Sequence, residues 1–161
     1  MSFSPALTDQ QRLQLETWYQ KFHTDAFIPE DPVCIPHAFS LKQDIEISGF
    51  LTATIAWGQR KMILKNARNL LEKMDYSPYD FVISASESEL TRLKSFVHRT
   101  FQGEDCLYFL QKLKELYQTN EDMETLLVNH CPPEDPDIQN ALIGLRNFFF
   151  PEGSLHRASK H

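Results

Sequence analysis

Four cations in the middle of the chain have the types and spacing that would hold phosphate groups: Arg60, Lys61, Lys65 and Arg68. We expect a helix to begin near Arg60, with Lys61, Lys65 and Arg68 on one face because they recur at i, i+4 and i+7. Free backbone N–H groups at a helix start attract anions, and the cations would add to that attraction. Lys61 and Lys65 also repel each other by roughly 0.2–0.5 kcal/mol, which favours an anionic partner. The alternative is a solvated helix face.

Gln59 stands directly before these cations, on a turn that we expect at Gly58. Its amide can both donate and accept hydrogen bonds. One interpretation of Gln59 is a turn residue that caps the helix beginning near Arg60.

A second polar group lies in the run Phe96-Val-His-Arg-Thr-Phe101. A cation close to a helix C-terminus is favoured by the helix dipole alone. We therefore interpret His98 and Arg99 as part of the packing around one buried polar network, and the alternative is a functional site.

No set of side chains in the sequence indicates catalysis or a metal site. Cys34 with His37, and His130 with Cys131, offer two ligands each, whereas a structural zinc ion needs four around one point. Three carboxylates near the connector at 28–36 do not pair as an acid and a base: Asp31, Asp44 and Glu46. We predict no catalytic residue, no metal and no cofactor.

The element that must position Gln59 and the cations is the segment 44–57, in which the gaps between the apolar side chains hold only small residues from Ser48 onward. It carries no charge from Ser48 to Trp57, which predicts a helix that is buried on most sides. We expect it to begin between Leu41 and Asp44 and to end at Gly58.

Helical periodicity and capping signals predict the other elements. Three prolines in the segment 28–36 predict an extended connector on the surface. No stretch alternates as a strand does, so the fold class is all-α, an orthogonal multi-helix bundle. We expect one helical domain over residues 1–153, complete or incomplete, and a basic tail over 154–161 with no packing pattern. The remaining helices are expected at 9–23 and 60–74, from Pro78 onward, and at 86–97, 107–117, 123–128 and 138–148, with Gly103 to Asp105 separating two of them.

Length and composition bound the class of protein. A chain of 161 residues is long enough for one domain. Its net charge of −6 gives no global attraction for nucleic acid or an anionic membrane. Three scattered cysteines, no signal peptide pattern and no long apolar run favour a cytoplasmic protein without a membrane partner.

The run Thr52-Ala-Thr-Ile-Ala-Trp-Gly-Gln59 resembles the buried helix and glutamine-bearing turn of helix-hairpin-helix DNA glycosylases. A longer string resembles an uncharacterised bacterial family that is distantly similar to those enzymes. It runs from Asp31-Pro32 through Asp44-Ile-Glu-Ile and Trp57-Gly-Gln-Arg60 to Phe96-Val-His-Arg-Thr-Phe101.

This resemblance implies a glycosylase-like N-terminal portion of a longer base-excision-repair protein. Gln59 would fill the gap left by a flipped base, and Arg60, Lys61, Lys65 and Arg68 would contact DNA. The glycine-rich hairpin and the lysine or aspartate that follow it in glycosylases have no counterpart here, so the chain would not be catalytic alone, although a longer parent could be a glycosylase or lyase. The implied partners are DNA, and the missing C-terminal half or a second copy. The rival is a helical protein-interaction or structural module without nucleic-acid binding.

Overall fold

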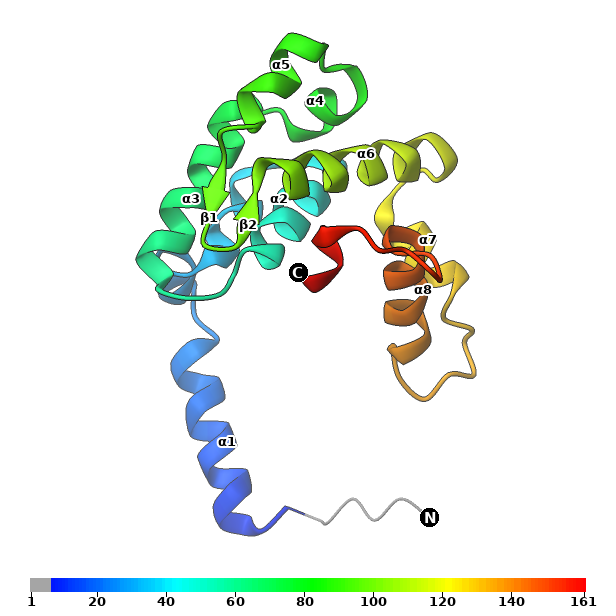
Figure 1. Cartoon of the computed structure of the whole chain (residues 1–161). Coiled ribbons are helices and arrows are strands. Elements are labelled where there is room, and N and C mark those ends of the chain that lie inside the picture. Colours follow the sequence, from blue (N-terminus) through cyan, green and yellow to red (C-terminus); the bar gives the residue numbers. More distant parts are fainter. Residues whose placement is uncertain (1–6) are drawn as a thin grey trace.

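The computed structural model describes residues 7–161, and this part of the chain is an all-α multi-helix fold, as the sequence predicts (Figure 1). The α-helices are α1 Asp9–Phe22, α2 Lys42–Thr54, α3 Arg60–Lys73, α4 Pro78–Ser84, α5 Glu87–Leu93, α6 Gly103–Thr119, α7 Met123–Asn129 and α8 Gln139–Phe149. Short 3₁₀ helices are η1 Asp25–Glu30, η2 Pro32–Cys34, η3 Pro36–Ala38 and η4 Arg157–Lys160. The strands β1 Val97–His98 and β2 Phe101–Gln102 form a small antiparallel hairpin.

Several helix starts lie where local signals place them. Thr8 and Gln11 form a capping box at α1, and Ser86 and Glu89 form one at α5. Pro78 takes the first position of α4, where its missing N–H costs nothing. The structure confirms these three predictions. The sequence could predict these helix starts because each depends only on contacts within one helical turn.

Helix α2 begins after Leu41 as expected, but it ends at Thr54, so the expectation that it continues to Trp57 is wrong. The amide of Ile55 bonds to the carbonyl of Thr52 at 3.2 Å, which tightens the last turn, and the chain then leaves the helix. Ile47 and Leu51 are at most 2% exposed, whereas Ala53 on the opposite side is exposed.

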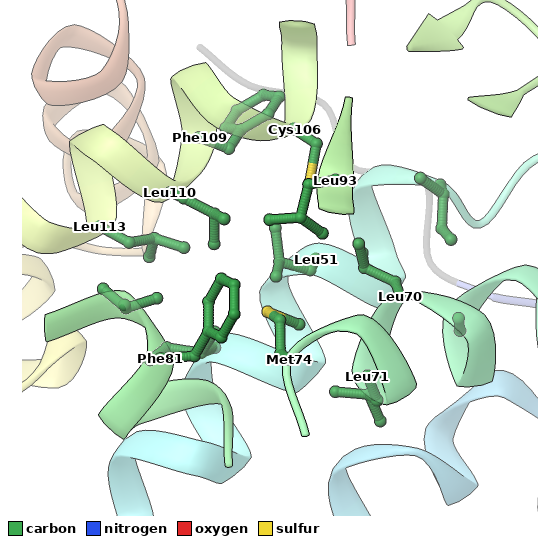
Figure 2. Close-up of a cluster of buried hydrophobic side chains, with 14 of the residues drawn as sticks. Leu51, Leu70, Leu71, Met74, Phe81, Leu93, Cys106, Phe109, Leu110 and Leu113 are labelled. Carbon is green, nitrogen blue, oxygen red and sulfur yellow. The ribbon is translucent and has the colours of Figure 1, made fainter. Parts of the chain in front are cut away.

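The core forms where α2 meets α3, α4, α5 and α6. Figure 2 shows side chains from these helices converging on one cluster, with Leu51 at its centre beside Met74 and Leu93. All three of these side chains are at most 2% exposed.

Two carboxylates at the start of α2 tie other helices to it. Asp44 accepts a hydrogen bond from the amide of Tyr79 at 2.8 Å, at the start of α4. Glu46 accepts from the amide of Met123 at 2.9 Å, at the start of α7, and from the hydroxyl of Tyr117 at 2.9 Å. Both carboxylates therefore satisfy amides at helix starts, where acidic groups are favoured.

The connector after α1 is not extended, which corrects the expectation from its prolines. It forms η1, η2 and η3, with Pro32 and Pro36 at first positions of 3₁₀ helices. Asp31 accepts a bond from the amide of Val33 at 3.0 Å, and Ile35 is only 4% exposed. Prolines fit the first positions of such short turns because no N–H is needed there.

The hairpin β1–β2 is a second correction, because no strand was expected and residues 103–105 were expected to separate two helices. The hairpin is the separator, and Gly103 already begins α6. A Cβ at Gly103 would lie 2.5 Å from the carbonyl oxygens of both Leu93 and Lys94. Glycine therefore lets the end of α5 approach the start of α6.

The segment 154–161 packs against α6 and the hairpin, which its sequence pattern did not indicate. Ala158 is fully buried, and the ring of His156 stacks on Tyr108 with centroids 3.8 Å apart. An Arg157 nitrogen lies 3.4 Å from a carboxylate oxygen of the fully buried Asp105.

Helix α1 extends away from the other helices (Figure 1). None of its residues is buried, and its apolar side chains Leu15, Trp18, Tyr19 and Phe22 are 47–53% exposed.

Candidate nucleic-acid interface

The turn between α2 and α3 places Gln59 at the surface. Gly58 has φ 108°, a conformation that suits glycine, and it reverses the chain after Trp57. Gln59 is exposed and precedes α3 as its N-cap residue. Its carbonyl accepts bonds from the amides of Met62 and Ile63, whereas its side chain makes no capping bond. The amide side chain of Gln59 is thus not used to hold the helix start.

A buried histidine fixes this turn from behind. His98 is 2% exposed, and its Nε2 lies 3.1 Å from the carbonyl oxygen of Trp57. Its Nδ1 lies 2.8 Å from the side-chain nitrogen of Asn66 on α3. The motif at 96–101 therefore contributes a buried polar contact that joins the hairpin, the turn and α3.

Arg99, which the sequence did not single out as a binding residue, joins the turn on its outer side. Its guanidinium lies 5.0 Å from the centre of the Trp57 ring, a cation–π distance. Its φ of 55° is uncommon for a residue other than glycine and follows from the two-residue loop of the hairpin. Arg99 lies beside Gly58 because β1 pairs with β2 and the resulting hairpin lies beside α3 (Figure 1). No local sequence pattern indicates this position of Arg99.

Three of the four cations selected from the sequence form one row on α3. Lys61, Lys65 and Arg68 are exposed at i, i+4 and i+7, and none makes an ion pair with a carboxylate of residues 7–161. They border a shallow hollow of about 600 Å³ that also reaches Glu72.

Arg60 differs from the other three cations because it has an acidic neighbour. It is exposed and lies 3.9 Å from Asp31, a long and solvated contact. Gln59 and Arg99 thus both lie at the turn before α3. The row of three cations continues from that turn along the helix, and Arg60 is partly neutralised beside the connector.

Residues 31–161 match a family that is described as a protein of unknown function (DUF2400). The chain belongs to the DUF2400 family. The search of curated proteins and the search of solved structures both give no match. The match confirms the expectation of an uncharacterised family and covers both the Gln59 turn and the hairpin of this DUF2400 chain.

The buried thiol of Cys106 in the DUF2400 chain is not suited to chemistry. Burial, with the neighbouring Asp105, raises the pKa of Cys106 to about 12, so this thiol stays protonated and is a poor nucleophile. Within residues 7–161, no three His, Cys, Asp or Glu side chains gather closely enough to hold a metal ion. The same part of the chain contains no helix that is long and apolar enough to cross a membrane.

Proposed function

We propose that this DUF2400 chain binds duplex DNA through the Gln59 turn and the outer face of α3. It would be the DNA-binding N-terminal part of a DNA-glycosylase-like, base-excision-type protein, and it would not catalyse excision alone. The observation that carries this proposal is an exposed glutamine followed by a row of exposed cations without acidic partners.

The length of the row supports a contact with one strand. Lys61 and Arg68 are seven residues apart, so the row spans about 10 Å along α3. One DNA strand carries a charge every ~3.4 Å of helix axis, so about three phosphates would fall within reach. Arg99 would add a cation on the hairpin side of Gln59.

The net charge of −6 argues that this attraction is local. A protein with this net charge repels a polyanion at long range, so binding must come from a patch that works against the global field. Arg60 would contribute less than the row because Asp31 offsets part of its charge.

The role of Gln59 rests on the resemblance of residues 52–59 to glycosylases together with its exposure. A flipped base leaves a gap whose unstacking costs a few kcal/mol, and a side chain that enters the gap reduces that cost. The Gln59 amide is free to face the orphaned base because it caps nothing.

A salt series tests the proposal. We expect the chain to bind labelled duplex DNA at low salt, and Lys61→Ala, Lys65→Ala and Arg68→Ala each to reduce the slope of log affinity against log salt by about 1. Lys21→Ala on α1 is the matched control and should leave the slope unchanged. Gln59→Ala should remove a preference for an abasic site over intact duplex while leaving the salt slope unchanged. Absence of salt-dependent binding, or equal loss with Lys21→Ala, overturns the proposal.

One observation favours a second candidate, a helical protein-interaction module without nucleic-acid binding. Helix α1 has 14 residues and buries none of them, although helices of this length are marginal in water without tertiary contacts. Trp18 and Phe22 on its apolar face would then contact another polypeptide. Sedimentation of the wild type and of a Trp18→Ser, Phe22→Ser double variant tests self-association through this face. Loss of concentration-dependent association in the variant, together with no DNA binding by the wild type, supports the module.

A further inference from the structure

Arg99 has a backbone conformation that glycine adopts more easily than arginine. Its φ is 55°, in the left-handed region, in the two-residue loop between β1 and β2. Residues other than glycine that keep a strained conformation gather at functional sites, where the side chain has a task. The contacts of the Arg99 side chain indicate what that task is.

The ring of Trp57 fixes the position of the Arg99 guanidinium. The guanidinium carbon lies 5.0 Å from the centre of the ring. Trp57 is itself held by two histidines. The ring of His98 meets it edge to face with centroids 5.5 Å apart, and the ring of His161 stacks with it at 6.3 Å. A cation that is fixed in this way loses little conformational entropy when a ligand binds to it.

The two edges of the Arg99 guanidinium face different surroundings. A Cβ on Gly58 would lie 2.9 Å from Nη1 and 3.3 Å from Cδ of Arg99, so the edge formed by these two atoms lies against the turn. Nε and Nη2 donate from the opposite edge, where their two N–H groups are parallel. That edge points away from the turn, and Arg99 is exposed.

Within the described part of the chain, no protein group uses this pair of donors. The arginines that donate side-chain hydrogen bonds within residues 7–161 are Arg12, Arg92 and Arg157. The ion pairs of the same residues do not include Arg99 either. A planar pair of charged donors matches two oxygens of one oxyanion, such as a phosphate.

We propose that Arg99 binds one DNA phosphate through both Nε and Nη2, and that this phosphate adjoins the gap that Gln59 fills. The inference rests on the proposed function and adds to it a phosphate subsite outside α3. Arg99 packs against Gly58, which directly precedes Gln59, and consecutive Cα atoms are about 3.8 Å apart. Arg99 thus positions the strand beside the base that Gln59 faces.

Replacement of Arg99 by lysine separates the pair of donors from the charge. We expect Arg99→Ala to reduce the slope of log affinity against log salt by about 1, because one phosphate contact is lost. Arg99→Lys keeps the charge and the slope, but it loses the paired donors and should bind labelled abasic duplex about tenfold more weakly than the wild type. Arg146→Lys is the matched control, because Arg146 is also exposed and lies on α8, and it should bind as the wild type does.

Two further measurements test the place of the phosphate and the role of the backbone. The effects of Arg99→Ala and Gln59→Ala on binding of abasic duplex should not add, since both residues act at one gap. Arg99→Gly relieves the left-handed backbone, so it should unfold at a higher urea concentration than Arg99→Ala and bind DNA equally weakly. Recovery of DNA binding in Arg99→Gly would assign the loss to a destabilised turn and overturn the proposal.

Other outcomes overturn the proposal without touching the proposed function. If Arg99→Lys binds as tightly as the wild type, a point charge is sufficient. If Arg99→Ala leaves the salt slope unchanged, Arg99 contacts no phosphate. Strict additivity with Gln59→Ala would place the phosphate away from the gap. In each of these cases, salt-dependent binding and the slopes of the α3 variants still test the proposed function separately, whereas no DNA binding by the wild type overturns both proposals.

Discussion

The imidazole Nε2 of His98 lies 3.1 Å from the carbonyl oxygen of Trp57, and the two rings meet edge to face with centroids 5.5 Å apart. Asn66 presents its amide nitrogen to Nδ1 at 2.8 Å. An amide nitrogen only donates, so Nδ1 accepts and Nε2 carries the proton that is donated to Trp57. One neutral histidine thus holds the residue that precedes Gly58 and Gln59.

Replacing His98 with phenylalanine tests this arrangement. The ring fits a similar space, but the Trp57 carbonyl and the Asn66 amide lose their partner, and a buried polar group without one costs about 1–3 kcal/mol. We expect the free energy of unfolding to fall by that amount, measured by urea denaturation. DNA affinity should also fall, because the Gln59 turn is less well fixed.

A double-variant cycle distinguishes the hydrogen bonds from simple packing. Asn66→Leu removes one of the two groups that His98→Phe leaves without a partner, so the double variant should be more stable than the sum of the single changes indicates. Strict additivity of the two changes would show that the bonds to His98 contribute nothing.

Gly58→Ala probes the turn itself. The φ of 108° is unfavourable for a residue with a Cβ, and that Cβ would lie 2.9 Å from Nη1 of Arg99. We expect a loss of about 1–2 kcal/mol in the free energy of unfolding. The substitution should also displace Arg99 from the Trp57 ring, which tryptophan fluorescence can report.

The same substitution in an Arg99→Ala background separates the two causes. Removing the long side chain relieves the contact but leaves the backbone conformation unchanged. Gly58→Ala should therefore cost less in this background, though still a measurable amount. An undiminished cost would place the whole effect in the backbone.

The features of this fold that the sequence predicts correctly depend on contacts between residues that are close together in the chain. The starts of α1 and α5 follow from the side chains of Thr8 and Ser86, which bond to amides three residues on. The end of α2 and the hairpin depend instead on burial. Phe96 and Phe101, at 2% and 0% exposure, pack against each other only because the chain reverses between them. Periodicity over one segment contains no information on that contact.

In the candidate interface, too, some features follow from the local sequence and others depend on tertiary packing. The exposure of Lys61, Lys65 and Arg68 on one face follows from helical spacing, which the sequence displays. The contact of Arg60 with Asp31 and the position of Arg99 join segments that lie 29 and 42 residues apart in the chain. Such contacts arise from tertiary packing, so the sequence alone did not indicate them. Whether this surface binds DNA stays a prediction.

Arg157 and Asp105 provide a test of the packing of the segment 154–161. Asp105 is fully buried, and one of its oxygens accepts a bond from the amide of Gln102 at 2.8 Å. Burial lowers the pKa of the nearby His161, so at neutral pH Arg157 is the main positive charge beside Asp105. We expect Arg157→Met to reduce the free energy of unfolding by about 1–3 kcal/mol, because the buried carboxylate loses its compensating charge.

Asp105→Asn in the Arg157→Met background is the control. Asparagine still accepts the bond from Gln102 and carries no charge, so it should recover part of the lost stability in chemical denaturation. If Asp105→Asn destabilises the Arg157→Met variant further, the charge of Asp105 is not what Arg157 compensates.

The pairing of Lys42 with Asp122 predicts a pH dependence of stability. Lys42 Nζ lies 2.5 Å from an Asp122 oxygen, and this bond, followed by the bonds from Thr125, lowers the pKa of Asp122 to about 2. An unfolded aspartate has a pKa of about 3.9. Because the folded pKa is the lower one, the contribution of this carboxylate to stability is present above pH 4 and is lost as the pH falls towards 2. Lys42 stays charged throughout, since its pKa is raised by its bonds to Asp122 and Glu124.

Urea midpoints of the wild type and of Asp122→Asn, measured from pH 7 to pH 2, test this prediction. Asparagine can still accept the bond from the Thr125 amide, so the substitution removes mainly the charge. The wild type should be more stable at pH 5–7, and the difference between the two proteins should shrink as the pH falls from about 4 to about 2. A difference that is the same at pH 2 as at pH 7 would mean that the ionised Asp122 does not contribute through its bond to Lys42.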